Sequence, residues 1–273
     1  MNKKPIVFLD SGVGGLPYYS EFTRRNPHRE AVYIADRKNF PYGKKSKNEL
    51  VDLLVHIIAA LVERINPVMV VLVCNTASVS ALDELRTLFS GIMFVGTVPA
   101  VRPAALNSKT GIIGVLGTKR TIEDKYIDRI IREIERPCKI IRSAAPELVD
   151  FIEHNYFTSS PAEKRAVVNQ WTERIRSHRA DGLVLGCTHF LFLLNEFKQA
   201  AQPDITIYDS LNGVCSNAER LLLDARFSDA PENPEHSLLV TGGKQNLDIW
   251  EKWARAFKLN LCDFDGYLSK QDL

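Results

Sequence analysis

The sequence predicts an α/β protein with two similar domains, each a mostly parallel sheet flanked by helices. Apolar runs of strand length alternate along the chain with longer amphipathic stretches. Two segments, 70–76 and 182–189, also share one design: an apolar run ends in a cysteine and is followed by small polar residues and a helical pattern. Cys74 and Cys187 are separated by a plausible domain length, which favours two related halves.

The individual elements follow from these patterns. The predicted strands are Ile6–Leu9, Ala31–Ile34, Val68–Val73, Met93–Val95, Ile112–Leu116, Cys138–Arg142, Leu183–Leu185, Ile205–Tyr208 and Ser237–Thr241. Helical patterns between them include Lys47–Arg64, Ala81–Phe89, Glu123–Glu135, Ala162–His178 and Val214–Leu223. The runs 68–73 and 183–185 are apolar throughout, as expected of strands that are buried on both faces.

Composition narrows the functional classes. The 273 residues suffice for two small domains, and 35 basic against 33 acidic residues give a net charge of +2. This near-balance argues against a nucleic-acid-binding surface. No segment approaches the roughly 20 apolar residues of a membrane helix, and the residues before Ile6 lack a signal-peptide cleavage site. We therefore expect a cytoplasmic protein with neither a nucleic-acid nor a membrane partner.

Five cysteines occur without a CxxC pair or regular spacing, which favours reduced thiols over a disulfide framework. Cys74 and Cys187 each follow a predicted buried strand and precede a helical stretch. That edge of a parallel sheet is where ligands bind, and a helix N-terminus there lowers a thiol pKa. The alternative for each is a small buried hydrophobe. Cys138, Cys215 and Cys262 have no organised polar surroundings and are interpreted as structural.

His189 follows Cys187 by two residues, so its imidazole can orient or polarise a thiolate. A structural thiol beside a hydrogen-bonded histidine is the alternative. A metal site built from cysteine and histidine would need further ligands at a coherent spacing, and the sequence offers none. We therefore predict no metal.

Three further segments follow predicted strands. The glycine-rich segment 10–15 fails the dinucleotide fingerprint, because Pro17 occupies the third glycine position, and a tight turn around a small anion fits better. Asp10 either caps the next helix, accepts a hydrogen bond from a substrate ammonium, or assists a thiol as a base. The turn 41–43 can present main-chain N–H groups and the edge of Tyr42 to a carboxylate, or be a plain turn. Thr118 and Thr121 can bind a carboxylate or simply cap a helix.

Together these motifs resemble the glutamate racemase family. The matching segments are 10–16, 41–43, 74–78, 117–118 and 186–189, in the family's order, whereas the stretch Asp36–Phe40 departs from the family pattern. The resemblance implies a first domain of residues 1–99 with 212–273, a second domain of residues 100–211, and an active site in the cleft between them. It also implies a homodimer.

The resemblance further implies interconversion of L- and D-glutamate without a cofactor, which supplies D-glutamate for bacterial peptidoglycan. It implies that Cys74 and Cys187 are the paired acid and base and that Glu153 assists the second cysteine. The resemblance also matches the family's substrate contacts to Asp10, Ser11, Tyr42, Gly43, Asn75, Thr76, Thr188 and His189. With the interpretations above, Asp10 and His189 join the predicted catalytic residues, and Pro41, Thr118 and Thr121 join the predicted substrate-binding residues.

Inversion of an α-carbon requires proton removal on one face and proton delivery on the other, and two cysteines on opposite faces can do both. Several alternatives stay open on the sequence alone. The chain could racemise aspartate or another amino acid, bind a small ligand without chemistry, or be a thiol redox or metal protein.

Overall fold

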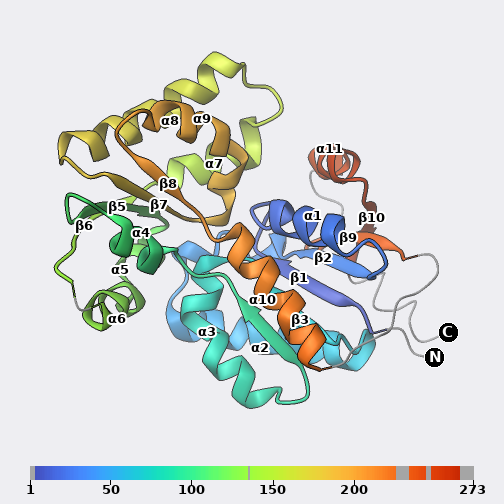
Figure 1. The fold of residues 1–273 in the computed structure, drawn as a ribbon. Coiled ribbons are helices and arrows are strands. Elements are labelled where there is room, and N and C mark those ends of the chain that lie inside the picture. Colours follow the sequence, from blue (N-terminus) through green and yellow to red (C-terminus); the bar gives the residue numbers. More distant parts are fainter. Residues whose placement is uncertain (1–3, 135, 226–233, 244–246, 265–273) are drawn as a thin grey trace. The chain divides into compact units, whose positions relative to one another are not determined.

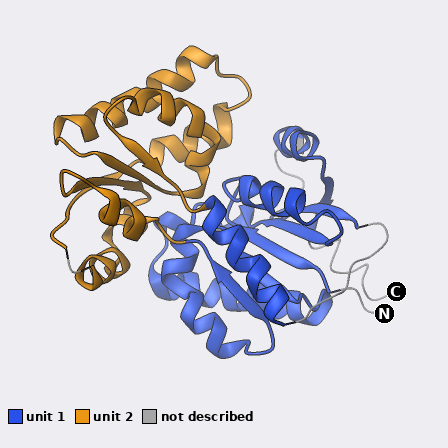
Figure 2. Cartoon of the chain, in the orientation of Figure 1, with its two compact units in different colours: residues 1–97, 211–273 blue, residues 98–210 orange. Residues whose placement is uncertain are grey.

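The computed structural model describes residues 4–134, 136–225, 234–243 and 247–264 (Figure 1). The chain forms two compact units: unit 1 comprises residues 1–97 and 211–273, and unit 2 comprises residues 98–210 (Figure 2). Each unit contains one sheet, and every strand pair that the described residues form is parallel. The predicted class of parallel sheets flanked by helices is confirmed.

The sheet of unit 1 has six strands in the order β10-β9-β2-β1-β3-β4. Their bounds are β1 Ile6–Asp10, β2 Ala31–Ala35, β3 Met69–Leu72, β4 Met93–Gly96, β9 His236–Val240 and β10 Asn260–Asp263. The strand β10 is absent from the sequence prediction. It lies at the sheet edge with polar residues at both of its ends, so it lacks the apolar run that marks the central strands.

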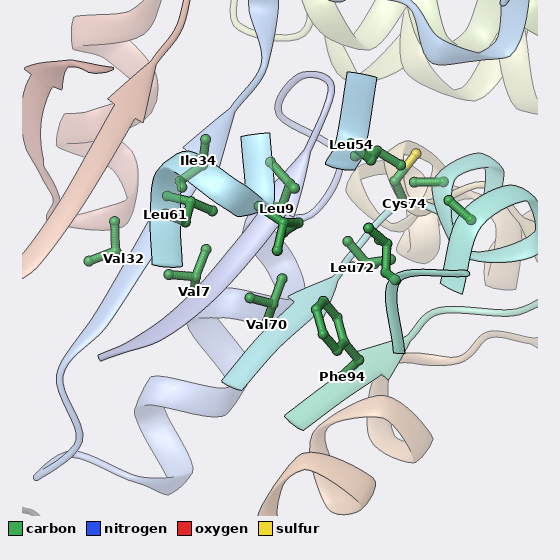
Figure 3. Close-up of a cluster of buried hydrophobic side chains, with 14 of the residues drawn as sticks. Val7, Leu9, Val32, Ile34, Leu54, Leu61, Val70, Leu72, Cys74 and Phe94 are labelled. Atoms are coloured by element: carbon green, nitrogen blue, oxygen red, sulfur yellow. The ribbon is translucent and has the colours of Figure 1, made fainter. Parts of the chain in front are cut away.

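Helices cover both faces of this sheet. They are α1 Leu16–Arg25, α2 Lys47–Arg64, α3 Asn75–Leu88, α10 Leu211–Asp224 and α11 Leu247–Phe257, with short 3-10 helices η1 Arg37–Asn39 and η2 Tyr42–Lys44. Apolar side chains of α2 and α3 pack on one face against alternate residues of the strands, such as Val7, Leu9 and Val70 (Figure 3). On the other face, Phe8 contacts the rings of Tyr19 and Phe22 from α1.

The sheet of unit 2 has four strands in the order β6-β5-β7-β8. Their bounds are β5 Ile112–Gly117, β6 Lys139–Ala144, β7 Gly182–Gly186 and β8 Thr206–Tyr208. Its helices are α4 Val101–Asn107, α5 Lys119–Glu123, α6 Lys125–Glu133, α7 Pro146–Asn155, α8 Pro161–Ser177 and α9 Leu194–Ala201, with the 3-10 helix η3 Thr188–Leu193. Helix α8 lies so close to β5 that a Cβ at Gly114 would come within 2.6 Å of Ile175 Cδ1, which explains the glycine in a buried strand.

Helix boundaries show where local chemistry overrides the sequence pattern. The helix expected at 47–64 forms as predicted, with a capping box of Ser46 and Glu49 at its start. The helix expected at 81–89 begins earlier, at Asn75, directly after Cys74. The helix expected at 123–135 divides at Asp124, whose extended backbone ends α5 and whose carboxylate accepts a hydrogen bond from Tyr126 N at 2.8 Å to begin α6. The last residue of that prediction, Glu135, lies outside the described residues.

The burial of α2 predicts the cost of shortening one of its side chains. Leu54 is fully buried in the core of unit 1, so Leu54→Ala should lower the free energy of unfolding by about 2–5 kcal/mol through lost burial and a residual cavity. Leu88, in α3, is 60% exposed, and Leu88→Ala should change that free energy by less than about 0.5 kcal/mol. Urea denaturation followed by circular dichroism measures both values. Equal losses in the two variants would contradict the assigned core.

Candidate active site

Unit 1 gathers four polar groups at one edge of its sheet. Parallel strands direct their carboxyl ends to the same edge, and here Asp10 ends β1 while Asp36, Cys74 and Thr241 follow β2, β3 and β9. Main-chain hydrogen bonds hold these ends together: Asp36 N donates to Asp10 O at 2.8 Å, and Thr241 N donates to Ala35 O at 3.0 Å. All four side chains are buried. Three segments that are distant in the sequence thus end at the same edge of the sheet as the Cys74 segment.

Cys74 occupies the N-cap position of α3, in an extended conformation with φ −137° and ψ 115°. Its thiol therefore lies beside the first N–H groups of a 14-residue helix, whose dipole favours a thiolate or a bound anion. Asn75 follows in the first turn and is 3% exposed. Neither polar atom of its amide has a hydrogen-bond partner among the residues that the structure describes. An unpaired buried amide is costly, so it marks a place where a ligand can supply the missing partners.

The glycine-rich turn after β1 is locked by Tyr33. The Tyr33 hydroxyl accepts a hydrogen bond from Gly15 N at 3.0 Å and donates one to Gly12 O at 2.8 Å. Glycine is required at position 15, because a Cβ there would come within 2.2 Å of Val73 Cγ2. The capping alternative for Asp10 is wrong, since α1 begins at Leu16 with Gly15 as its N-cap. The Asp10 carboxylate instead accepts a 2.6 Å hydrogen bond from Ser11 N.

The turn 41–43 differs from its expected presentation. Tyr42 is 1% exposed, and its ring belongs to the same apolar cluster as Cys74. Its hydroxyl donates a 2.8 Å hydrogen bond to Asp36 Oδ2. Burial raises the pKa of Tyr42 well above its usual range, and the negative charge of Asp36 adds to this effect, so the hydroxyl keeps the proton that it donates. The groups that this turn can offer to a ligand are therefore the first N–H groups of η2, not the tyrosine edge.

Unit 2 holds a buried triad of side chains. Cys187 follows β7 and is the N-cap of η3, which carries His189, while Glu153 comes from α7. The Cys187 Sγ lies 3.7 Å from His189 Nδ1, and His189 Nε2 lies 2.7 Å from Glu153 Oε1. All three side chains are at most 6% exposed. The sequence-predicted residues Cys187, His189 and Glu153 are thus brought together, the last from 36 positions away.

The electrostatics of this triad favour a charged histidine. Burial alone lowers the pKa of His189, but its hydrogen bonds to Cys187 and Glu153 outweigh that effect and hold the pKa well above the usual range. An imidazolium between a thiol and a carboxylate stabilises the thiolate and fixes the ring's orientation. Contacts at both ring nitrogens therefore hold the imidazole between Cys187 Sγ and the Glu153 carboxylate.

Comparison with known proteins identifies the family at this point. The model of the Asp/Glu/Hydantoin racemase family matches residues 19–213. A glutamate racemase from Glaesserella parasuis is 34% identical over 270 residues, which cover 96% of this chain and 98% of that protein. Another from Shewanella oneidensis is 37% identical over 219 residues, covering 80% of this chain and 79% of the relative. This chain belongs to the Asp/Glu/hydantoin racemase family. It is an amino-acid racemase, an isomerase.

Solved structures of family members share the fold. Glutamate racemase isoform RacE1 from Bacillus anthracis superposes with a TM-score of 0.82 at 27% identity, covering 96% of this chain and 98% of that one. The Escherichia coli glutamate racemase, solved with L-glutamate and the activator UDP-MurNAc-Ala, gives a TM-score of 0.80 at 28% identity, covering 95% and 97%.

The predicted threonines of this racemase follow one of the two cysteines directly in the chain or follow a strand that pairs with β7. Thr76 is in the first turn of α3 and Thr188 is the first residue of η3, and both side chains are buried. Thr118 follows β5, the neighbour of β7, and caps α5 by accepting a 3.3 Å hydrogen bond from Thr121 N. The capping interpretation is therefore confirmed for Thr118, and carboxylate binding by either threonine stays a prediction.

Two other cysteines of the racemase, Cys215 and Cys138, have raised thiol pKa values. Burial raises the pKa of the Cys215 thiol to about 12, and its Sγ lies 3.7 Å from Tyr18 O. Burial also raises the pKa of Cys138.

Across the described part of the chain, no group of three or more His, Cys, Asp or Glu residues could hold a metal ion. No helix there is both long and apolar enough to cross a membrane.

Sequence reasoning missed Asp36 and Thr241. In the sequence, Asp36 begins the stretch that departs from the family pattern, and Thr241 ends a predicted strand. The signal that could have found them is positional, because both follow strands that pair with β1 or its neighbour.

The triad predicts a measurable shift at His189. Glu153→Gln removes the negative charge that helps to hold the imidazolium, so the pKa of His189 should fall. The raised pKa of His189 also stabilises the folded state at low pH. This contribution to the free energy of unfolding is complete below the unfolded-state pKa of His189 and is lost as the pH rises through its folded-state pKa. Nitrogen-15 NMR of the histidine rings reports the titration directly. Glu147→Gln, on the exposed face of the same helix, is the control and should leave it unchanged.

Proposed function

We propose that this racemase interconverts L- and D-glutamate, with Cys74 and Cys187 as the paired acid and base and with neither an organic cofactor nor a metal. The supporting observation is that each unit carries a thiol at the same topological position, after a central parallel strand and at the N-cap of the following helix. The relatives from Glaesserella parasuis and Shewanella oneidensis are both named glutamate racemase, which supports glutamate as the substrate.

In the proposed reaction, one cysteine as thiolate removes the α-hydrogen of the amino acid and the other, as thiol, protonates the opposite face. The roles reverse for the other enantiomer. Cysteine suits both roles, because its ordinary pKa of about 8.5 leaves a few per cent thiolate near neutrality. His189 and Glu153 support the thiolate of Cys187. Asp10, at the end of the strand next to β3, is proposed to assist Cys74.

The α-hydrogen of an amino acid is weakly acidic, so the developing negative charge needs stabilisation. We assign this stabilisation to hydrogen-bond donors on segments that adjoin each cysteine along the chain or in the same unit. On the Cys74 side these are the main chain of the turn 41–43 with the side chains of Ser11, Asn75 and Thr76. On the Cys187 side they are the hydroxyls of Thr118, Thr121 and Thr188. The unpaired amide of Asn75 supports this assignment most directly.

We also propose that the functional domains are residues 1–99 with 212–273 and residues 100–211. In the proposed mechanism, both thiols must reach the same α-carbon during turnover. We propose that the enzyme is cytoplasmic, acts as a homodimer and supplies D-glutamate for peptidoglycan.

Racemisation in heavy water tests the reaction. The purified protein incubated with L-glutamate should produce D-glutamate that carries deuterium at the α-carbon, without added cofactor. Cys74→Ser and Cys187→Ser should each lower kcat/KM at least about 100-fold, because each removes a general acid–base group. Cys138→Ser, a thiol outside the proposed site, is the control and should keep full activity. Full activity in both site variants would refute the two-thiol mechanism.

The same assay separates the alternatives. A higher kcat/KM for aspartate than for glutamate would replace the proposed substrate. Binding without deuterium incorporation would indicate a ligand-binding protein. Activity abolished by a chelator and restored by a metal, or dependent on redox poise, would indicate a metal or redox enzyme.

A further inference from the structure

Asp36 is a buried carboxylate held by neutral donors. It is 1% exposed and follows β2. Its oxygens accept hydrogen bonds from the Tyr42 hydroxyl at 2.8 Å, from Asn39 Nδ2 at 3.0 Å, and from Thr241 Oγ1 at 2.6 Å. None of these side chains is cationic. A buried carboxylate without a cation depends on such hydrogen bonds, so each donor is strongly held in place.

Thr241 connects this carboxylate to the opposite end of the chain. Its hydroxyl donates to Asp36 Oδ1 and accepts a 3.0 Å hydrogen bond from Lys38 N, while its own N–H bonds Ala35 O. One side chain therefore fixes both ends of the segment 36–38, across a separation of 205 residues. The next residue, Gly242, packs closely against the same segment. Its φ is +91°, and a Cβ there would lie 3.3 Å from Lys38 Cα, so glycine suits this position.

Asp36 passes this constraint to the turn 41–43 through Tyr42. The Tyr42 hydroxyl is fixed on Asp36, and its ring packs in the cluster that contains Cys74, Leu54 and Ala77. The main-chain N–H groups of η2 are therefore positioned by a chain of two hydrogen bonds, from Thr241 to Asp36 and from Tyr42 to Asp36.

We propose that Thr241 is a positioning residue, which acts through Asp36 and Tyr42 to hold the turn 41–43 in its substrate-binding conformation. This inference rests on the proposed function, since it uses that turn as part of the glutamate site. Thr241 itself touches no reacting atom in this account. Its loss should weaken substrate binding more than it slows proton transfer.

Thr241→Val tests the inference because it keeps the volume and removes the hydroxyl. We expect KM for L-glutamate to rise about tenfold, because the substitution removes the hydrogen bond to the Asp36 carboxylate that supports substrate binding. The value of kcat should change less than about threefold. Thr241→Ser keeps the hydroxyl and should restore KM to near the wild-type value. Thr87→Val is the control, because the exposed Thr87 hydroxyl donates only within α3, to Asp83 O.

A double-mutant cycle with Tyr42→Phe tests the proposed route. If Thr241 acts through Tyr42, the two substitutions together should raise KM by less than the product of their separate effects. Any of three results would overturn the inference. The KM effects of the two substitutions could multiply, KM could stay at the wild-type value in Thr241→Val, or Thr241→Ser could fail to restore KM.

Hydrogen exchange at the amides of residues 42–44 provides a readout that needs no substrate. Thr241→Val should accelerate exchange there and leave α8 of unit 2 unchanged, whereas unchanged exchange at 42–44 would overturn the positioning role. If Thr241→Val does not fold, the same measurements on Tyr42→Phe replace it, because that substitution removes the other hydrogen bond of the proposed route. If the wild-type protein neither binds nor racemises glutamate, the glutamate assignment fails, and the exchange result still decides the role of Thr241.

Discussion

Parallel pairing of β1 with both β2 and β3 is the constraint on which the surroundings of Cys74 in unit 1 depend. It forces segments that are far apart in sequence to end at one edge, where each strand leads into a turn or a helix. The thiol of Cys74 gains its position at a helix N-terminus from this geometry alone, without a side-chain cap. Unit 2 repeats the arrangement around Cys187, because β5 pairs in parallel with both β6 and β7, the strand that leads into Cys187.

The two units treat their buried carboxylates in different ways. In unit 2, Glu153 is paired with an imidazole that is itself in contact with the thiol, so the carboxylate acts on the charge of the site. In unit 1, Asp36 is surrounded by neutral donors and ties together three segments of chain. The first arrangement raises the pKa of an imidazole, and the second fixes the conformation of the chain around Asp36.

The clearest sequence signals come from particular residue types that directly follow a predicted strand. The two cysteines belong to this class, as do the glycine-rich turn after β1 and the histidine two residues beyond Cys187. The role of Tyr42 was harder to predict, because a tyrosine in a turn can face solvent or the core. Its burial follows from the position of Asp36, which the local sequence does not reveal.

The sequence by itself determined the alternation of strands and helices, the parallel class of both sheets and the two cysteine-ended strands, because these depend on periodicity and on neighbours within a few residues. Only the tertiary structure decided the edge strand β10, the meeting of Glu153 with His189, and the meeting of Thr241 with Asp36. Those features depend on which distant segments pair and on which polar groups share a buried volume. Strand order and side-chain burial fix both, and no local pattern in the chain encodes either of them.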